Sequence, residues 1–229
     1  MAGAQARGSG TAPRPDIGRV VMVPAASAMI LLDVRALLGA RSPLGAQGGA
    51  AGATAVLGVA GAVLAGAFYA QVAWCYLRRG PATASSSSPA ARIIAVAATV
   101  APFAFPLLAG RPPSAARQFA ADALLVAGTA WAAWSLHCLG RNLSVVAQAR
   151  AIADRGPYQW VRHPLYTGEL ACSLGLALAA GTAPAWALWL ALAAMQAARA
   201  REEERVLLAA LPGYRGYRAR TAAFLPGLL

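Results

Sequence analysis

Residues 156–169 read Gly-Pro-Tyr-Gln-Trp-Val-Arg-His-Pro-Leu-Tyr-Thr-Gly-Glu, in a chain that is otherwise mostly Ala, Leu, Val and Gly. The Gly-Pro pair is typical of a turn, and Pro164 disfavours helical geometry at His163. Proline is favoured as the first residue of a helix, and the apolar run after Pro164 can continue one. We therefore expect Arg162, His163 and Tyr166 to cluster at a helix N-terminus, where free N–H groups can hold an anion.

The composition is that of an integral membrane protein. Of 229 residues, 59% are hydrophobic and only 12% are charged, with a mean hydropathy of +0.53. Ordinary soluble domains carry about a quarter charged residues. The formal net charge of +12 comes from arginine without any lysine. Cytoplasmic loops facing anionic lipid explain this charge better than nucleic-acid binding, because no nucleic-acid motif accompanies it.

The cysteines show no pattern of a metal site or a disulfide. Cys75, Cys138 and Cys172 lie in or beside apolar runs, without CxxC spacing. We interpret them as buried packing residues, and the sequence predicts no metal centre.

The apolar runs predict an all-α, polytopic bundle of about six membrane spans. A disordered tail is expected at residues 1–19 and four spans within residues 20–140. These spans are 20–40, 48–77, 93–109, kinked at Pro102 and Pro106, and 119–139, with a Ser, Pro and Gly linker at 80–89. A cleaved signal peptide is the alternative for the first run, but Asp33 and Arg35 stand where a small-residue cleavage site is needed.

The catalytic region is expected within residues 141–229. Its apolar runs, 165–180 and 185–198, are joined by four residues and predict an antiparallel helical hairpin. Arginine is concentrated in alternate loops and in both terminal segments. This positive-inside pattern predicts that both termini and the 156–169 stretch face the cytoplasm, as in a bacterial inner membrane protein.

A second polar segment follows the hairpin. Residues 199–205 read Arg-Ala-Arg-Glu-Glu-Glu-Arg, which places Arg199 and Glu203 four residues apart on one helix face. A solvated helix with ion pairs one turn apart is the simpler interpretation. The hairpin, however, returns this helix to the end of the bundle where His163 and Tyr166 are expected, so the two polar segments should meet.

The two segments together resemble a known family. Gly-Pro-Tyr-x-x-Val-Arg-His-Pro-x-Tyr-x-Gly-Glu, followed about thirty residues later by Arg-x-x-x-Glu-Glu and then Tyr-x-x-Tyr, is similar to the isoprenylcysteine carboxyl methyltransferases and their relatives among membrane phospholipid methyltransferases. The resemblance covers roughly residues 139–226. It implies S-adenosylmethionine as methyl donor, in a cytoplasm-facing pocket closed by the C-terminal segment, and a lipophilic or prenylated substrate that enters from the bilayer.

The resemblance also implies roles for individual residues. Arg199 corresponds to the residue that meets the substrate carboxylate, and Glu203 is expected to act with it in catalysis. The cofactor-contacting positions implied by the resemblance are Gln148, Ile152, Ala153, Tyr158, His163, Pro164, Leu165, Tyr166 and Glu203. The segment between Gln148 and the Gly-Pro turn is shorter than in eukaryotic members, so a prenylated protein need not be the acceptor.

The chemistry of the residues favours a carboxylate acceptor. A carboxylate is already deprotonated, so methyl transfer needs alignment but no general base. An Arg to orient the acceptor and a carboxylate to anchor the donor suit this reaction. An amine, hydroxyl or thiol acceptor is the first alternative, with His163 as the candidate base. A nicotinamide-dependent lipid reductase and a non-enzymatic membrane protein are the others, although the spans hold few polar residues to line a transport path.

Overall fold

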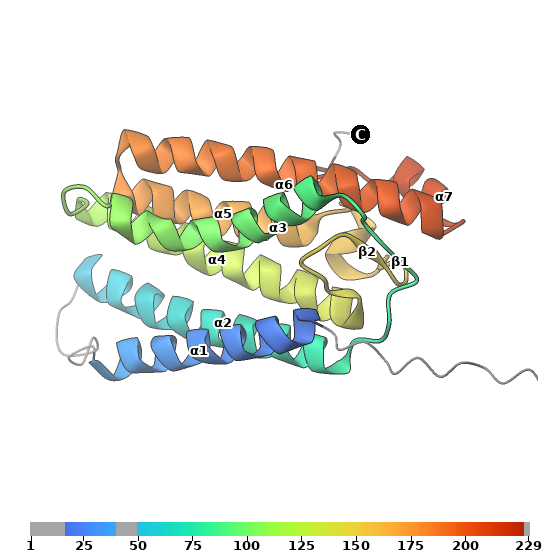
Figure 1. The fold of residues 1–229 in the computed structure, drawn as a ribbon. Helices are drawn as coiled ribbons and strands as arrows, with labels where there is room; N and C mark the ends of the chain where they lie inside the picture. The colour runs from blue at the N-terminus through green and yellow to red at the C-terminus, as the bar shows by residue number, and fades with distance from the viewer. Residues whose placement is uncertain (1–16, 40–49, 227–229) are drawn as a thin grey trace, which may run out of the picture.

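The computed structural model describes residues 17–39 and 50–226, which form a bundle of long helices (Figure 1). The α-helices are α1 (Ile17–Gly39), α2 (Ala50–Arg78), α3 (Pro89–Val100), α4 (Ala115–Leu139), α5 (Pro164–Ala180), α6 (Ala183–Ala210) and α7 (Tyr214–Arg220). Three 3-10 helices lie between them: η1 (Ala101–Leu108), η2 (Gly140–Asn142) and η3 (Gly156–Gln159). The strands β1 (Ala84–Ser85) and β2 (Gln148–Ala149) form a small antiparallel sheet.

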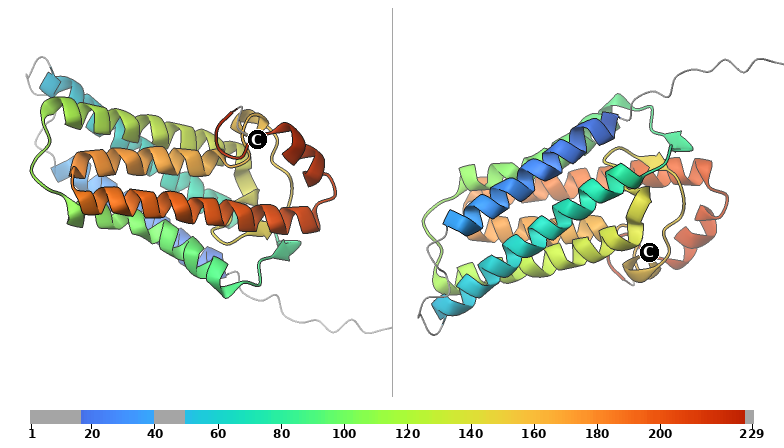
Figure 2. Two further views of the ribbon diagram at one scale, coloured as in Figure 1. Left: turned by 90° about the horizontal axis from the view of Figure 1, so that it is seen from above. Right: turned by 90° about the horizontal axis from the view of Figure 1, so that it is seen from below.

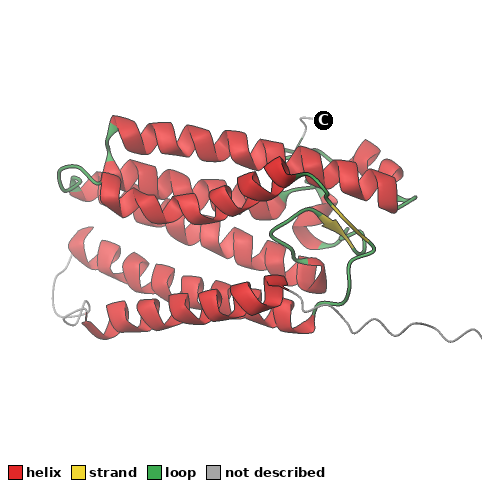
Figure 3. Cartoon of the chain, viewed as in Figure 1, coloured by secondary structure: helices red, strands yellow, loops and turns green. Residues whose placement is uncertain are grey.

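The helices are arranged around α4 and the hairpin of α5 and α6. Seen from above, α4, α5, α6 and α3 lie side by side in that order (Figure 2). Helix α2 packs on α4, and α1 packs on α2. The sheet, the loop before α5 and α7 gather at one end of the bundle, as Figure 3 shows by secondary structure. The irregular segments that carry the polar residues therefore share one end.

Three helical segments are long and apolar enough to cross a membrane. They are 55–78, 89–108 and 115–142. These segments show that the described chain has the helices of an integral membrane protein, but the predicted six spans are not confirmed. The remaining long helices are α1, α5 and α6, of which α5 has only 17 residues, fewer than the ~20 that a perpendicular span needs.

The predicted break in the third apolar segment and the predicted hairpin turn are found where the sequence placed them. The second half of the third apolar segment is the 3-10 helix η1, which has Pro106 inside it. The hairpin turn is made by Gly181, whose φ of 66° ends α5 in the left-handed conformation, and by Thr182, whose side chain caps α6. The antiparallel hairpin is confirmed.

Glycines let α5 lie close to α4, among them Gly128 and Gly168. A Cβ on Gly128 would come within 2.6 Å of the backbone nitrogen of Cys172, and one on Gly168 within 2.8 Å of the backbone nitrogen of Ala132. Both positions therefore require glycine for the close approach of the two backbones. This contact fixes the start of α5, where His163 and Tyr166 lie.

Three details differ from the expectation. The 80–89 segment is more than a linker, because Ala84 and Ser85 pair with Ala149 and Gln148 and make the bundle not purely α-helical. The first helix begins at Ile17, inside the predicted 1–19 tail, of which residues 1–16 lie outside the described part of the chain. The apolar run 185–198 and the polar segment after it form the single helix α6.

Candidate functional site

The His-Pro turn before α5 is held by the C-terminal segment. His163 has φ −122° and ψ 54°, outside helical geometry, and Pro164 begins α5 as predicted. The backbone N–H groups of Arg162 and His163 donate to the carbonyls of Ala222 and Ala223, at 2.8 and 3.1 Å. The chain after α7 thus packs directly on the turn and fixes the position of the His163 side chain.

Glu204 is the anion beside this turn. Its Oε1 accepts from Nε of Arg162 at 2.7 Å and lies 3.2 Å from Nε2 of His163, while its Oε2 lies 3.2 Å from Nε of Arg218. Burial alone would raise the pKa of Glu204, but the hydrogen bonds and charges of His163 and Arg162 lower it to about 2. Glu204 thus places an anion beside the side chains of Arg162 and His163, and an anion held by the N–H groups at the start of α5 stays a prediction.

Tyr166 connects the two polar segments. Its hydroxyl donates to Oε2 of Glu203 at 2.9 Å. The ring of His163 stacks on that of Tyr166, with centroids 5.5 Å apart and planes 2° from parallel, and Nδ1 of His163 lies 3.9 Å from the same Glu203 oxygen. The predicted meeting of the two segments is confirmed, and Glu203, with 31% of its side chain exposed, is hydrogen-bonded across the hairpin to Tyr166.

Arg199 is buried one helical turn before Glu203. Its guanidinium lies over the Tyr166 ring, 4.7 Å from the centroid. Its Nη1 donates to Oε1 of Gln196 at 3.0 Å and its Nη2 to the carbonyl of Val145 at 3.3 Å. Its Nε is buried and has no hydrogen-bond partner among the residues that the structure describes. A buried cation with an unfilled donor is costly unless a ligand completes it.

These side chains border a cavity of about 580 Å³ inside the bundle. One end is polar; the rest is bordered by apolar residues of α1, α2, α3, η1 and α4, including Met22, Phe68, Val72, Val96 and Phe103. Seven of the predicted site residues line it: Gln148, Tyr158, His163, Leu165, Tyr166, Arg199 and Glu203. The first two helices, which carried no diagnostic sequence, thus contribute part of its wall.

Three predicted contact residues lie outside the cavity lining. Ile152 and Ala153 are partly buried residues in the loop between β2 and η3, and Ile152 packs near Gly213. Pro164 is buried, and its carbonyl accepts from Nε1 of Trp131 at 2.8 Å. Their assigned contacts stay predictions, whereas the geometry gives Pro164 a clear part in anchoring α5 to α4.

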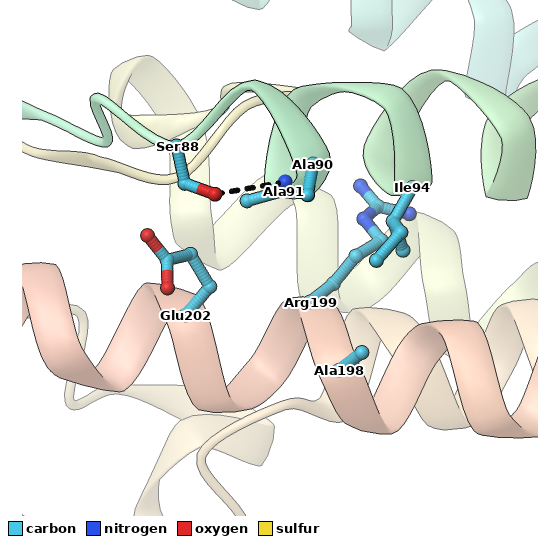
Figure 4. A pocket seen from close by; sticks show the side chains of 7 residues that line it. All are labelled: Ser88, Ala90, Ala91, Ile94, Ala198, Arg199 and Glu202. Atoms are coloured by element: carbon cyan, nitrogen blue, oxygen red, sulfur yellow. Dashed lines mark hydrogen bonds between the residues drawn. The ribbon is translucent and has the colours of Figure 1, made fainter.

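Arg199 also borders a smaller pocket, of about 180 Å³, between α6 and the start of α3 (Figure 4). In the close view the guanidinium reaches from α6 past Ile94 toward α3, and Glu202 points toward Ser88. Glu202 accepts from Ser86 and is paired with Arg205. Glu202 is thus occupied by the buried Ser86 and by Arg205, whereas Glu203 is bound by Tyr166.

Among the polar residues of the cavity that sequence reasoning missed are two that contact each other beside Arg199. Glu169 and Gln196 both line it, and Nε2 of Gln196 donates to Oε2 of Glu169 at 2.6 Å. Glu169 is the last residue of the 156–169 stretch, and Gln196 is a lone polar residue three positions before Arg199 in an apolar run. The three-residue spacing, which places Gln196 and Arg199 on one helix face, was the signal that could have found it.

The part of the chain that holds most of this site matches a known protein family. Residues 116–211 match the family model of the phospholipid methyltransferases. The matched range contains α4, the His-Pro turn, the hairpin and the polar part of α6. The resemblance predicted from the sequence is confirmed at this level, because that family is related to the isoprenylcysteine carboxyl methyltransferases. The match makes residues 116–211 similar to phospholipid methyltransferases, and the described chain has three helices long and apolar enough to cross a membrane.

A curated relative is similar to part of the chain. The cobalt-zinc-cadmium resistance protein CzcN of Cupriavidus metallidurans is 38% identical over 106 residues, which cover 46% of this chain and 45% of the relative. The match therefore spans less than half of the relative's length. Within the described residues, no group of three or more His, Cys, Asp or Glu side chains is placed to hold a metal ion.

Proposed function

We propose that the protein is an S-adenosylmethionine-dependent methyltransferase that methylates the carboxylate of a lipophilic, isoprenylcysteine-like acceptor. The observation that carries this proposal is Arg199: a buried guanidinium with an unfilled Nε donor, on the wall of a mainly apolar cavity. A planar guanidinium offers a fork that matches a carboxylate. An amphiphile with a carboxylate head and an apolar tail fits such a wall.

The polar end of the cavity suits the methyl donor. Pockets that bind small molecules commonly have volumes of about 300–1,000 Å³, and this cavity has a volume of about 580 Å³. Oε1 of Glu203 accepts no hydrogen bond from the described residues, so it can receive one from the ammonium or a ribose hydroxyl of the donor. Gln148, Tyr158 and Leu165 complete this end.

Glu203, the proposed contact of the methyl donor, and Arg199, the proposed contact of the acceptor, are held close together, which would align the two substrates. Tyr166 binds Glu203 through its hydroxyl and supports Arg199 with its ring, so donor and acceptor anchors share one rigid side chain. Methyl transfer is an in-line displacement that requires the nucleophile, methyl carbon and sulfur to be collinear. When bound, the donor supplies a methyl sulfonium, and the acceptor oxygen forms a bond to carbon as the carbon–sulfur bond breaks. A carboxylate and a sulfonium become a neutral ester and a neutral thioether, and an apolar cavity favours this loss of charge.

The surroundings of His163 favour a carboxylate over an acceptor that must lose a proton. Its Nδ1 lies 3.9 Å from Glu203 and its Nε2 lies 3.2 Å from Glu204. Both ring nitrogens are therefore directed at carboxylates of the protein, and the imidazole acts as a positioning group rather than a free base. Amine, hydroxyl and thiol acceptors form the second candidate class. We also propose that the protein lies in a bacterial inner membrane, with this site facing the cytoplasm.

Transfer of a labelled methyl group to an S-prenylcysteine analogue tests this function. The detergent-purified protein is incubated with S-adenosylmethionine carrying a labelled methyl group and the analogue, and the lipophilic product is treated with base. A carboxyl methyl ester releases its label as methanol under base, whereas a methylated amine, ether or thioether retains it. Base-labile label is expected; base-stable label would move the assignment to the second acceptor class.

A further inference from the structure

Arg199, the proposed contact of the acceptor carboxylate, faces the cavity together with a residue of opposite charge. Glu169 on α5 lines the same cavity as Arg199 on α6, and the nearest oxygen and nitrogen of the pair are 3.9 Å apart. Ionised groups within a membrane bundle are costly and usually mark ligand sites. Glu169 keeps 35% of its side chain exposed, whereas Arg199 keeps only 8%. The carboxylate is therefore the more accessible member of the pair.

Gln196 prevents the two charges from closing into a tight ion pair. Its amide oxygen accepts from Nη1 of Arg199 at 3.0 Å, and its amide nitrogen donates to Oε2 of Glu169 at 2.6 Å. Inserted in this way, the amide holds both charges in fixed positions. Nε of Arg199 has no partner, and Oε1 of Glu169 accepts no hydrogen bond from the residues that the structure describes. Each charged group thus keeps at least one hydrogen-bonding position that the described residues do not fill.

Glu169 and Arg199 each have a hydrogen-bonding position that the described residues do not fill. A ligand that carries a positive group next to a negative group could pair its positive group with Glu169 and its negative group with Arg199. A simple fatty carboxylate would fill Arg199 but would bring its own negative charge near Glu169, which is unfavourable. A head with a carboxylate and an adjacent ammonium would satisfy both positions. The apolar remainder of the cavity would take a hydrocarbon tail.

We propose that Glu169 is a specificity-determining residue that binds the α-ammonium of a lipophilic amino-acid acceptor while Arg199 binds its carboxylate. This inference rests on the proposed function, because it places the ammonium beside the carboxylate that is methylated. It narrows the acceptor to a lipidated amino acid with a free amino group. Gln196 acts as a positioning residue that sets the distance between the two charges.

Two probes with the same tail and carboxylate test the proposal. One is S-farnesylcysteine, with its free amino group; the other is S-farnesyl-3-mercaptopropionate, which lacks that group. Their affinities are measured by calorimetry at neutral pH, where the α-amino group is mostly protonated, on the detergent-purified protein saturated with S-adenosylhomocysteine. The wild type should bind the amino-acid probe at least about tenfold more tightly, as expected for a charge-assisted hydrogen bond.

Substitution of Glu169 should remove this preference. In Glu169→Gln the affinity ratio should fall to about one, since the amide cannot pair with the ammonium and Arg199 loses its internal counter-charge. Glu202→Gln, a carboxylate of α6 occupied by Ser86 and Arg205, should keep the wild-type ratio. Equal affinity of the two probes in the wild type would overturn the proposal without any variant, as would a preference that survives in Glu169→Gln.

The rates with both probes separate this inference from the proposed function. If the binding preference depends on Glu169 but neither probe becomes methylated, the charge pair is a zwitterion site and carboxylate methylation is wrong. If both are methylated at the same rate and bind equally well, the proposed function stands and the role of Glu169 is wrong.

Discussion

The hydroxyl of Tyr166 donates a 2.9 Å hydrogen bond to Oε2 of Glu203, and this bond joins the first turn of α5 to the polar part of α6. The two residues are 37 positions apart in the chain and belong to the two predicted motif segments. The same tyrosine ring lies below the guanidinium of Arg199. One side chain therefore connects the proposed donor anchor with the proposed acceptor anchor.

Glu203→Gln should weaken the binding of S-adenosylhomocysteine by roughly ten- to a hundred-fold, since a neutral amide loses a charge-assisted hydrogen bond of about 1.5–3 kcal/mol. Calorimetry on the detergent-purified variant measures the change. The matched control is Glu202→Gln, one residue away but facing Ser86 and Arg205, which should bind like the wild type. Equal losses in both variants would mean that the effect comes from α6 as a whole and not from the cavity.

Arg199→Lys should leave cofactor affinity nearly unchanged and lower turnover by at least about tenfold, through misalignment of the attacking oxygen. Lysine retains the charge but offers no planar fork and cannot stack in the same way on Tyr166. Initial rates with an S-prenylcysteine analogue give the turnover, and Arg201→Lys, at an exposed position of the same helix, is the control. Parallel loss of cofactor binding and activity in Arg199→Lys would place Arg199 in the donor site or in the fold.

Glu204 should make stability depend on pH in the acid range. Because its pKa falls from 4.5 to about 2 in the folded protein, the ionised carboxylate stabilises the fold above about pH 4.5, and this contribution is lost as the pH falls toward about 2. After solvent screening it amounts to about 1–2 kcal/mol. Thermal unfolding in detergent should therefore show Glu204→Gln below the wild type at neutral pH, with the gap closing on acidification.

The control for this experiment is Asp154→Asn, at an exposed position near the same end of the bundle. Its unfolding temperature should differ little from that of the wild type at any pH, because surface charges contribute little. A gap between Glu204→Gln and the wild type that stays constant down to the lowest pH would show that the ionised form of Glu204 is not what stabilises the turn.

The close contact of α4 with α5 gives a prediction about packing. Gly128→Ala should destabilise the protein by about 1–3 kcal/mol, since the added methyl group would overlap backbone atoms of α5 that cannot move aside easily. Gly66→Ala, in α2, has nothing within 4 Å of the added Cβ and should be neutral or stabilising by up to about 1 kcal/mol, because alanine favours helix. Thermal unfolding of both variants makes the comparison, and equal stability would contradict the packing described for Gly128.

Local rules predicted much of the framework. The break before Pro164, the helix that it begins and the hairpin turn at Gly181 all follow from backbone preferences of proline and glycine. The same rules could not predict the pairing of Ala84 with Ala149, because 65 positions separate them and neither residue signals a strand. Residues of the first two helices line the cavity only through tertiary packing, which their apolar sequences do not specify.

The site was predicted in outline and completed by the fold. His163, Tyr166, Arg199 and Glu203 lie together because the hairpin returns α6 to the start of α5, as its short turn predicted. The sequence did not predict a role for Glu169, because that role depends on Gln196. The position of Gln196 beside Glu169 is set by the rotation of α6 relative to α5. Helix rotation depends on side-chain packing along the whole contact, and no short motif records it.

Titration of the detergent-purified wild type with S-adenosylhomocysteine tests the central claim most directly. We expect saturable heat with a micromolar dissociation constant, and no saturable heat from NADPH in a parallel titration. Circular dichroism and a cooperative thermal transition establish that the same sample is folded. A folded sample that gives no heat with S-adenosylhomocysteine, or that binds NADPH instead, would contradict the assignment of this cavity to a methyl donor.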